Sequence, residues 1–301
     1  MPTSLVAIAQ PPWGMTTPTT AQTIISVILA VAVTAFVGAA LIDWRRSGSP
    51  AFLLILAGGY ICSFNEATVD VLGHCFFPLD GVMGYTAFGR GVPVWVVLAY
   101  IVFFGGLSYV MALAFKHGAS HRVMCYGIAV FGVLNVLLEI PLLRAGLYVY
   151  YGYQPFAIGG FPVSWLVINS LGSLFGAVVV VRLSWLFTGA RQLLLVFVPF
   201  ATYMASWVLA MPYFAITNTD MPAGVRMAAA VLSMALGLVA IDGLIRIGTG
   251  QWRLLPPQKS DTPVDGRTQV YSRSWITLRN GRYERAAQFP SRAGGDHSKS
   301  S

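Results

Sequence analysis

Long runs of apolar residues dominate the first 245 positions of the chain, and they lack the strict alternation of half-buried strands. A helix needs about 20 mostly apolar residues to cross the hydrocarbon core of a bilayer. Seven runs reach or nearly reach that length, so the sequence predicts an all-α polytopic membrane protein with a bundle of seven transmembrane helices. The expected spans are residues 22–42, 51–75, 92–115, 122–143, 162–182, 192–214 and 225–245.

Composition supports the membrane prediction. Of the 301 residues, 56% are hydrophobic and only 10% are charged, whereas an ordinary soluble domain carries about a quarter charged residues. The net charge of +8 comes mainly from residues 246–301, which contain ten Lys/Arg and four Asp/Glu. Nucleic-acid binding calls for basic residues clustered on a folded module. Because these residues follow the last apolar run, we expect no nucleic-acid partner.

Basic residues near the span ends predict the orientation, since Lys and Arg stay preferentially on the cytoplasmic side. One side has only Arg90, Arg144 and Arg226. The other side has a larger group: Arg45, Arg46, Lys116, Arg122, Arg182, Arg191, Arg246 and Arg253. The sequence therefore predicts an N-terminus outside and a C-terminus in the cytoplasm, in the plasma membrane of the cell.

This pattern predicts that the chain has three parts. Residues 1–20 form a short extracytoplasmic segment, residues 21–246 the seven-helix domain, and residues 247–301 a basic cytoplasmic tail. The tail mixes Pro, Arg and Ser without apolar periodicity, which is typical of a disordered segment. Its basic residues offer contacts to anionic membrane lipid, but a solvated tail without such contacts is the simpler interpretation and the one we favour.

The second span carries the densest set of ionisable residues. Glu66, Asp70 and His74 stand at i, i+4 and i+8, on one helix face. An ionisable residue within a span costs about 2.5–3.5 kcal/mol, so it calls for a partner, a cavity or a function. Two carboxylates one turn apart in a low dielectric disfavour joint ionisation, which makes one of them a candidate proton donor. A structural network with hydroxyls or with an Arg of another span is the alternative.

More polar and aromatic candidates fall in the same, outward half of the predicted bundle. In the fourth span Asn135 and Glu139 are one turn apart, although Glu139 could also form a simple salt bridge with Arg144. The following loop is richer in tyrosine than an aromatic belt requires. We therefore expect an outward-facing polar and aromatic chamber with Glu66, Asp70 and Glu139 as catalytic candidates. Its candidate substrate-binding residues are His74, Asn135, Tyr148, Tyr150, Tyr151, Gln154, Trp165, Asn169 and Tyr213.

The residue inventory argues against several cofactors. Retinal needs a Schiff-base lysine in the last span, but the lysines are Lys116, Lys259 and Lys299. Four histidines do not supply the ligand sets of di-iron or haem proteins, and no Asp-rich run is present to hold magnesium diphosphate. The three cysteines lack paired spacing. We expect no cofactor and no metal site.

An apolar cavity with a protonated carboxylic acid and aromatic walls suits a reaction through a carbocation. The acid protonates an alkene or an epoxide, aromatic faces stabilise the cation, and exclusion of water prevents early quenching. In span count, body length and the acid Glu66 in span two, residues 20–245 resemble the small integral-membrane terpene cyclases of meroterpenoid and indole-terpenoid pathways. The tyrosine-rich loop is also similar to stretches of carotenoid-modifying membrane proteins.

The resemblance implies a proton-initiated cyclisation of a lipophilic isoprenoid, with Glu66 as proton donor and Asp70 tuning it. Those cyclases also have an acid in the last span. Asp242 is the candidate here, but the predicted topology puts it at the cytoplasmic end, which leaves Asp70 or Glu139 as the better second carboxylate.

Two other functions remain open for the same residues. A non-enzymatic binder or transporter of a lipid or small molecule would use the same chamber, and a structural membrane subunit would need none. Exchange of Glu66 for Gln separates the first two, because it removes the ionisable acid and keeps the size and hydrogen bonding. An enzyme would then lose turnover and keep its ligand, whereas a binder would largely survive.

Overall fold

The computed structural model describes residues 9–217, 219–252, 278–279 and 282–283. Within this part of the chain, seven helical segments are long and apolar enough to cross a membrane. Each overlaps one of the seven predicted runs, which confirms a multi-pass membrane protein. The spans are Thr19–Ser47, Ala51–Gly73, Val94–Lys116, His121–Arg144, Ser164–Arg182, Gly189–Thr217 and Ala223–Gly248.

Four spans are continuous α-helices and three are composite. The continuous ones are α1 (Thr19–Ser47), α6 (His121–Arg144), α7 (Ser164–Arg182) and α9 (Ala223–Gly248). Span two comprises α2 (Ala51–Cys62), the 3-10 turn η1 (Ser63–Asn65) and α3 (Glu66–Gly73). Span three comprises α4 (Val94–Tyr100), the π-helical segment η2 (Ile101–Leu107) and α5 (Ser108–Lys116). Span six follows the short 3-10 helix η3 (Ser184–Leu186) and joins η4 (Gly189–Phe197) to α8 (Val198–Thr217).

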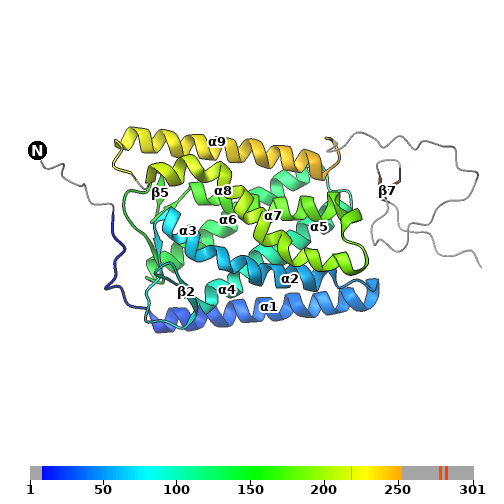
Figure 1. Ribbon diagram of the computed structural model, residues 1–301, viewed down its shortest axis with the longest axis horizontal. Coiled ribbons are helices and arrows are strands. Elements are labelled where there is room, and N and C mark those ends of the chain that lie inside the picture. The colour runs from blue at the N-terminus through cyan, green and yellow to red at the C-terminus, as the bar shows by residue number, and fades with distance from the viewer. Residues whose placement is uncertain (1–8, 218, 253–277, 280–281, 284–301) are drawn as a thin grey trace, which may run out of the picture.

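Short antiparallel strand pairs, which the all-α prediction missed, occupy the loops at one end of the bundle (Figure 1). With two to five residues each, they are too short to leave a clear alternating pattern in the sequence. They are β1 (Cys75–Phe76) with β4 (Val149–Tyr150), β2 (Met83–Ala87) with β3 (Arg90–Pro93), and β5 (Ala157–Ile158) with β6 (Phe161–Pro162). A fourth pair, β7 (Leu278–Arg279) with β8 (Arg282–Tyr283), follows the bundle in sequence.

We call the end with β1 to β6 the strand end. The opposite end, where α1 stops at Ser47 and α9 stops at Gly248, is called the tail end (Figure 1). The predicted disordered tail, residues 247–301, lies mostly outside the described residues.

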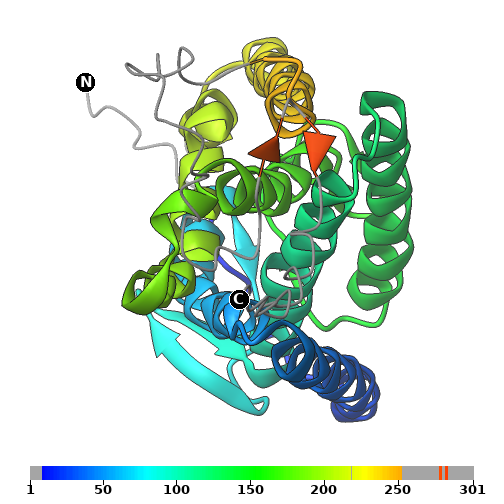
Figure 2. The ribbon, with the colours of Figure 1, turned by 90° about the vertical axis from the view of Figure 1, so that its right-hand side faces the viewer.

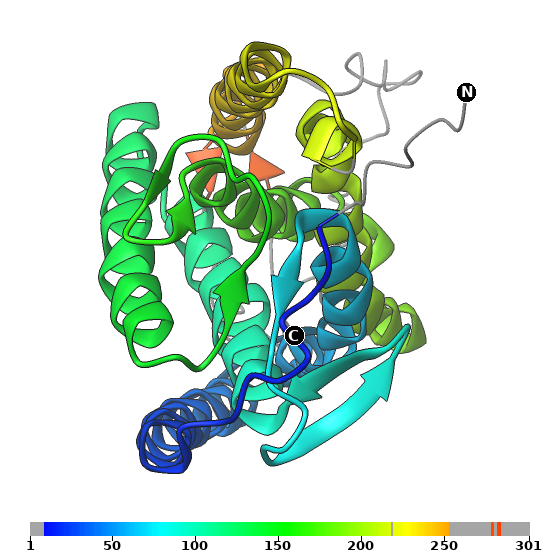
Figure 3. The same cartoon turned by 90° about the vertical axis from the view of Figure 1, so that its left-hand side faces the viewer.

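Helix α7 forms the centre of the bundle. Of its most apolar stretch, 72% is buried inside the protein, against 17% for α1 and for α6. Figures 2 and 3, seen from the two ends, show α1, α6 and α9 at the periphery. Their exposed side chains include Val31, Val133 and Val239, as expected for surfaces that contact lipid tails.

The backbone departs from α-helical geometry in spans two and three, and neighbouring side chains bind the released carbonyl groups. The Tyr85 hydroxyl donates to the Ser63 carbonyl at 2.5 Å, and the Ser173 hydroxyl donates to the Phe103 carbonyl at 2.8 Å. Such partners are needed because the hydrocarbon core has no water to bind a free carbonyl. π-helical segments occur frequently at functional sites.

The strand end is covered by paired loops and by the segment before α1. The β1–β4 pairing joins the chain after α3 to the tyrosine-rich loop, and Tyr151 donates its backbone N–H to the His74 carbonyl at 2.8 Å. Residues 9–18 cross the same end (Figure 3). There the Trp13 ring meets the Phe76 ring edge-on, with centroids 5.4 Å apart.

Candidate active site

A cavity lies between spans two, three, four and five, close to the strand end. Its volume is about 110 Å³, which leaves room for several waters. The cavity brings together the three predicted catalytic acids, Glu66 and Asp70 from α3 and Glu139 from α6. Five of the predicted substrate-binding residues also line it: Asn135, Tyr148, Tyr150, Trp165 and Asn169.

Glu66 is the first residue of α3, directly after the η1 turn. Its carboxylate accepts a hydrogen bond from the Tyr100 hydroxyl of span three. The sequence left open whether a hydroxyl or an Arg would bind this acid, and the structure provides the hydroxyl. A neutral donor satisfies one oxygen of the carboxylate without adding a positive charge to the cavity.

Asp70 lies one turn further along α3 and is 1% exposed. Neither of its carboxylate oxygens has a hydrogen-bond partner among the described residues. The Cys75 thiol lies beside the carboxylate without reaching hydrogen-bond geometry. Burial raises the pKa of Cys75, and the nearby Asp70 raises it further, so this residue lines the cavity as a neutral thiol. Asp70 is therefore the acid that is open to a ligand in the cavity.

Glu139 is held by a chain of neutral donors from α6, α7 and the loop after α6. The Tyr148 hydroxyl donates to one carboxylate oxygen, and the Asn135 amide donates to the other at 3.3 Å. The Asn169 amide in turn donates to the Asn135 carbonyl oxygen at 3.3 Å. The predicted alternative, a Glu139–Arg144 salt bridge, is not formed: the ion pairs found in the described part of the chain involve Asp242.

Aromatic rings form most of the remaining wall. Tyr148 stacks on Phe77 with ring centroids 5.2 Å apart, and Tyr150 lies 5.9 Å from Trp165. Sequence reasoning missed a further set of lining residues, because nothing in an apolar run shows which of its aromatic rings face inward. That set is Cys75, Phe77, Trp95, Tyr100, Phe103, Phe104, Phe131 and Tyr203.

Four of the predicted substrate-binding residues do not line the cavity: His74, Tyr151, Gln154 and Tyr213. His74 ends α3 in the left-handed conformation, with φ of 54°, and stacks on Tyr151 at 4.8 Å. This backbone turn removes His74 from the helical register that it was expected to share with Asp70. Tyr213 donates to the Gln154 carbonyl oxygen at 2.5 Å, and the Gln154 amide donates to the Tyr151 carbonyl at 2.9 Å.

A buried arginine, also missed by sequence reasoning, lies between the cavity and residues 9–18. Arg90 is 7% exposed and donates to the Tyr151 hydroxyl at 2.6 Å. Its guanidinium lies 5.6 Å from the rings of Trp13 and Tyr151 and 6.0 Å from Phe76, in the range of cation–π contacts. The signal was present in the sequence, since Arg90 is one of only three basic residues on the side predicted to be outside.

Comparisons with protein-family models, with curated proteins and with solved structures found no match for this chain. The function is therefore argued from the residues and geometry above. In the part of the chain that the structure describes, His, Cys, Asp and Glu form no group of three arranged to hold a metal ion. Asp242, the acid of the last span, does not line the cavity.

Proposed function

We propose that this protein is an intramembrane enzyme that protonates a lipophilic substrate, most concretely a proton-initiated cyclase of an isoprenoid. One observation carries the proposal. Asp70 is a buried acid whose two oxygens lack hydrogen-bond partners among the described residues, in a cavity with aromatic walls. The resemblance of residues 20–245 to the small membrane terpene cyclases, in span count, body length and an acid in span two, supports the same chemistry.

The hydrogen bonds favour Asp70, rather than Glu66, as the proton donor. An ionised carboxylate is costly to bury without partners, so this position stabilises the carboxylic acid with its proton. Glu66 is already bound by Tyr100, whereas both oxygens of Asp70, one turn away, lack a partner among the described residues. We therefore assign proton donation to Asp70 and the tuning role to Glu66, the reverse of the assignment made from sequence.

Glu139 is suited to accept the proton at the end of the reaction. It lies on a different helix from Asp70, and the donors around it stabilise a negative charge. In this scheme Asp70 protonates the substrate, a ring closes on the resulting cation, and Glu139 removes a proton. The product is an isomer of the substrate, so no further reactant is required.

The aromatic wall performs two tasks in this scheme. Faces of Tyr148, Tyr150 and Trp165 stabilise a cation as it moves along the substrate. The paired loops at the strand end limit the access of water, which would otherwise quench the cation.

The cavity also favours an epoxide over a plain alkene as the protonated group. The indole N–H of Trp95 is buried without a hydrogen-bond partner among the described residues, and Trp95 lines the cavity. A hydrocarbon would leave this donor unpaired, at a cost of about 1–3 kcal/mol. An oxygen atom on the substrate would accept its hydrogen bond.

We further propose that the tail end faces the cytoplasm and the strand end faces outward, with the bundle in the cell membrane. The larger basic group predicted to be cytoplasmic stands at the tail end; its described members are Arg45, Arg46, Lys116, Arg122, Arg182, Arg191 and Arg246. The cavity then opens nearer the outer leaflet. Single-cysteine labelling from each side of sealed vesicles, at positions 48 and 219, tests this orientation.

Mass spectrometry of lipid extracts tests the reaction. An isoprenoid-producing host would express wild type, Asp70→Asn, Glu66→Gln or Asp242→Asn, with an empty vector as background. We expect a new product with wild type and with Asp242→Asn, loss of product with Asp70→Asn, and a reduced yield with Glu66→Gln. An undiminished product with Asp70→Asn would overturn the assignment of the donor.

A second assay separates an enzyme from a binder. Native mass spectrometry of the purified protein would show which lipids it retains. An enzyme with Asp70→Asn should accumulate bound substrate. If wild type and Asp70→Asn both hold the same unaltered lipid, with no product from either, the protein is a binder or transporter.

A further inference from the structure

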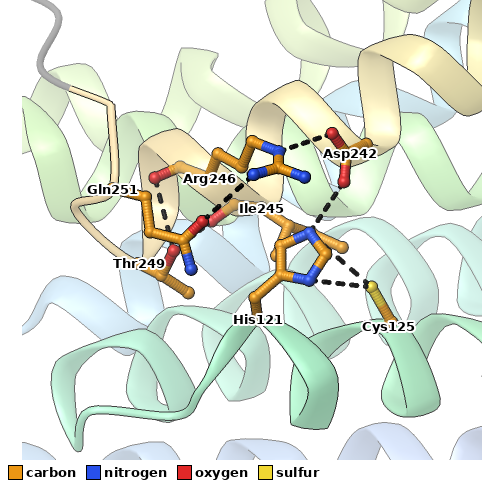
Figure 4. A network of polar contacts seen from close by, with 7 residues as sticks. All are labelled: His121, Cys125, Asp242, Ile245, Arg246, Thr249 and Gln251. Carbon is orange, nitrogen blue, oxygen red and sulfur yellow. Dashed lines mark hydrogen bonds and ion pairs between the residues drawn. The ribbon is translucent and has the colours of Figure 1, made fainter.

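A second cluster of reactive side chains, from the tail-end parts of α6 and α9, lies outside the cavity lining (Figure 4). The His121 ring of α6 uses Nε2 toward Asp242 of α9, with 2.7 Å between Nε2 and Oδ1. The Cys125 sulfur lies 3.6 Å from the other ring nitrogen, Nδ1, and 3.9 Å from Nε2. The second Asp242 oxygen accepts from Arg246 Nε at 2.6 Å. A thiol, an imidazole and a carboxylate are thus connected in that order.

This order is the arrangement of an activated nucleophile, in which a base contacts the nucleophile and a third group orients the base. Because Asp242 binds Nε2, it favours the tautomer with the proton on Nε2 and a lone pair on Nδ1, the ring nitrogen nearer to the thiol. Arg246 fixes the carboxylate from the other side. An ion pair that only joined α6 to α9 would not require the thiol at this position.

The position of Cys125 suits a reaction at the membrane surface. Cys125 is exposed and lies four residues after the start of α6, which corresponds to about 6 Å along the helix axis. Its own helix face is apolar, since Ala129 and Val133 follow it one and two turns along α6, and Val133 is 60% exposed. Such a face accommodates an alkyl chain attached to the sulfur.

Two basic residues lie close to the same location. Arg122 adjoins Cys125 on α6, and Arg246 reaches the cluster from α9. An electrophile with an anionic headgroup and a long alkyl chain matches both surroundings at once. Long-chain acyl-coenzyme A has this chemistry: its phosphates bind basic residues, and its thioester carbonyl joins the headgroup to the chain.

We propose that Cys125 is an acyl-acceptor site, with His121 as its base and Asp242 as a positioning residue, and that long-chain acyl-coenzyme A is the donor. His121 Nδ1 takes the thiol proton as the Cys125 sulfur attacks the thioester carbonyl. The bond from that carbonyl to the coenzyme A sulfur breaks, and the leaving thiolate takes the proton from the imidazolium. The products are S-acylated Cys125 and free coenzyme A, so atoms and electrons balance.

Purified full-length protein in lipid nanodiscs, incubated with palmitoyl-coenzyme A, tests the site. We expect one acyl group that hydroxylamine removes and that peptide mass spectrometry locates at Cys125. Cys62 and Cys75 are buried and serve as internal controls, and Cys125→Ser should abolish the modification. If N-ethylmaleimide labels Cys125 in the folded protein and palmitoyl-coenzyme A leaves it unmodified, the proposal is wrong.

The rate of acylation tests the roles of His121 and Asp242. His121→Gln keeps a hydrogen-bonding side chain and removes the base, so we expect a loss on the order of a hundredfold. His117→Gln is the matched control, because His117 is an exposed histidine outside the cluster. Asp242→Asn should change the pH profile of Cys125 alkylation as well as its rate. Wild-type rates and pH profiles in both His121→Gln and Asp242→Asn would overturn the assigned roles.

Discussion

The two ends of the bundle bind their acids in different ways. Near the strand end, Glu66 and Glu139 are bound by neutral hydroxyl and amide donors inside a cavity. At the tail end, the Asp242 side chain is 44% exposed and is bound by the cation of Arg246 and by His121. Asp242 is held by a cation where solvent is close. Glu66 and Glu139 keep surroundings in which a proton can be gained or lost, and this difference is what an acid–base site requires.

The largest expected effect tests whether acids of the cavity, and not acids in general, support turnover. Glu139→Gln removes the proposed proton acceptor and should lower product formation by about 10²- to 10⁴-fold. Asp43→Asn is the matched variant, because Asp43 accepts a hydrogen bond from Tyr109 at 2.9 Å away from the cavity. Turnover measured by product mass spectrometry should remain at the wild-type level in Asp43→Asn. Equal losses of turnover in Glu139→Gln and Asp43→Asn would show that the cavity acid has no special role in the reaction.

Removing the hydroxyl that donates to an acid should lower stability at either end of the bundle, but it should lower activity only at the cavity. Tyr148→Phe leaves one carboxylate oxygen of Glu139 without its donor and should lower the free energy of unfolding by about 1–3 kcal/mol. It should also reduce turnover by about tenfold, since about 1.4 kcal/mol of lost transition-state stabilisation has that effect. Tyr109→Phe removes the corresponding donor to Asp43 and should lower stability without lowering turnover. Denaturation of the purified variants and product assays give the two quantities, and normal turnover in Tyr148→Phe would contradict the role of Glu139.

A smaller effect is expected at the ion pairs of the tail end. Asp242→Asn weakens the contact between α6 and α9, but exposed ion pairs contribute little to stability and are screened by salt. The thermal midpoint should fall less than in Tyr148→Phe, and high salt should reduce the difference from wild type. A loss that is larger than in Tyr148→Phe and insensitive to salt would show that this cluster is buried in the working protein.

The smallest effect concerns pH at the strand end. Thr17 donates its backbone N–H and its hydroxyl to Asp80 at 2.8 and 2.7 Å, and these bonds lower the pKa of Asp80 below its ordinary value. Because the folded-state pKa is lowered, the stabilisation is present above the ordinary Asp pKa of about 3.9 and is lost as the pH falls through the folded-state value.

Hydrogen exchange of the Thr17 amide, corrected for its intrinsic pH dependence, should therefore accelerate in acid. Asp80→Asn should exchange quickly at every pH. The Gln22 amide, bound to the Pro18 carbonyl at 3.0 Å, is the control that should change little. Protection of Thr17 that does not respond to pH or to Asp80→Asn would exclude the contact.

Apolar run length was enough to predict all seven spans, and helical spacing was enough to place Glu66 and Asp70 beside one cavity. Prediction stopped where the backbone leaves regular geometry. The left-handed residue His74 breaks the i+8 relation, and two-residue strands such as β1 leave no alternating pattern. The hydroxyl partner Tyr100 was equally hidden, because helix rotation decides which tyrosine of an apolar span faces an acid.

The acids of span two also affect how the chain enters the membrane. This span has the lowest mean hydropathy of the seven, 1.4, and it carries Glu66 and Asp70. Spans of low hydropathy partition weakly from the translocon on their own. Its second half becomes shielded only when α4 supplies Tyr100, so biogenesis should depend on the joint insertion of spans two and three as a helical hairpin. Replacing Asp70 with leucine would then ease insertion of the protein as it removes the proposed acid, and yield and activity would change in opposite directions.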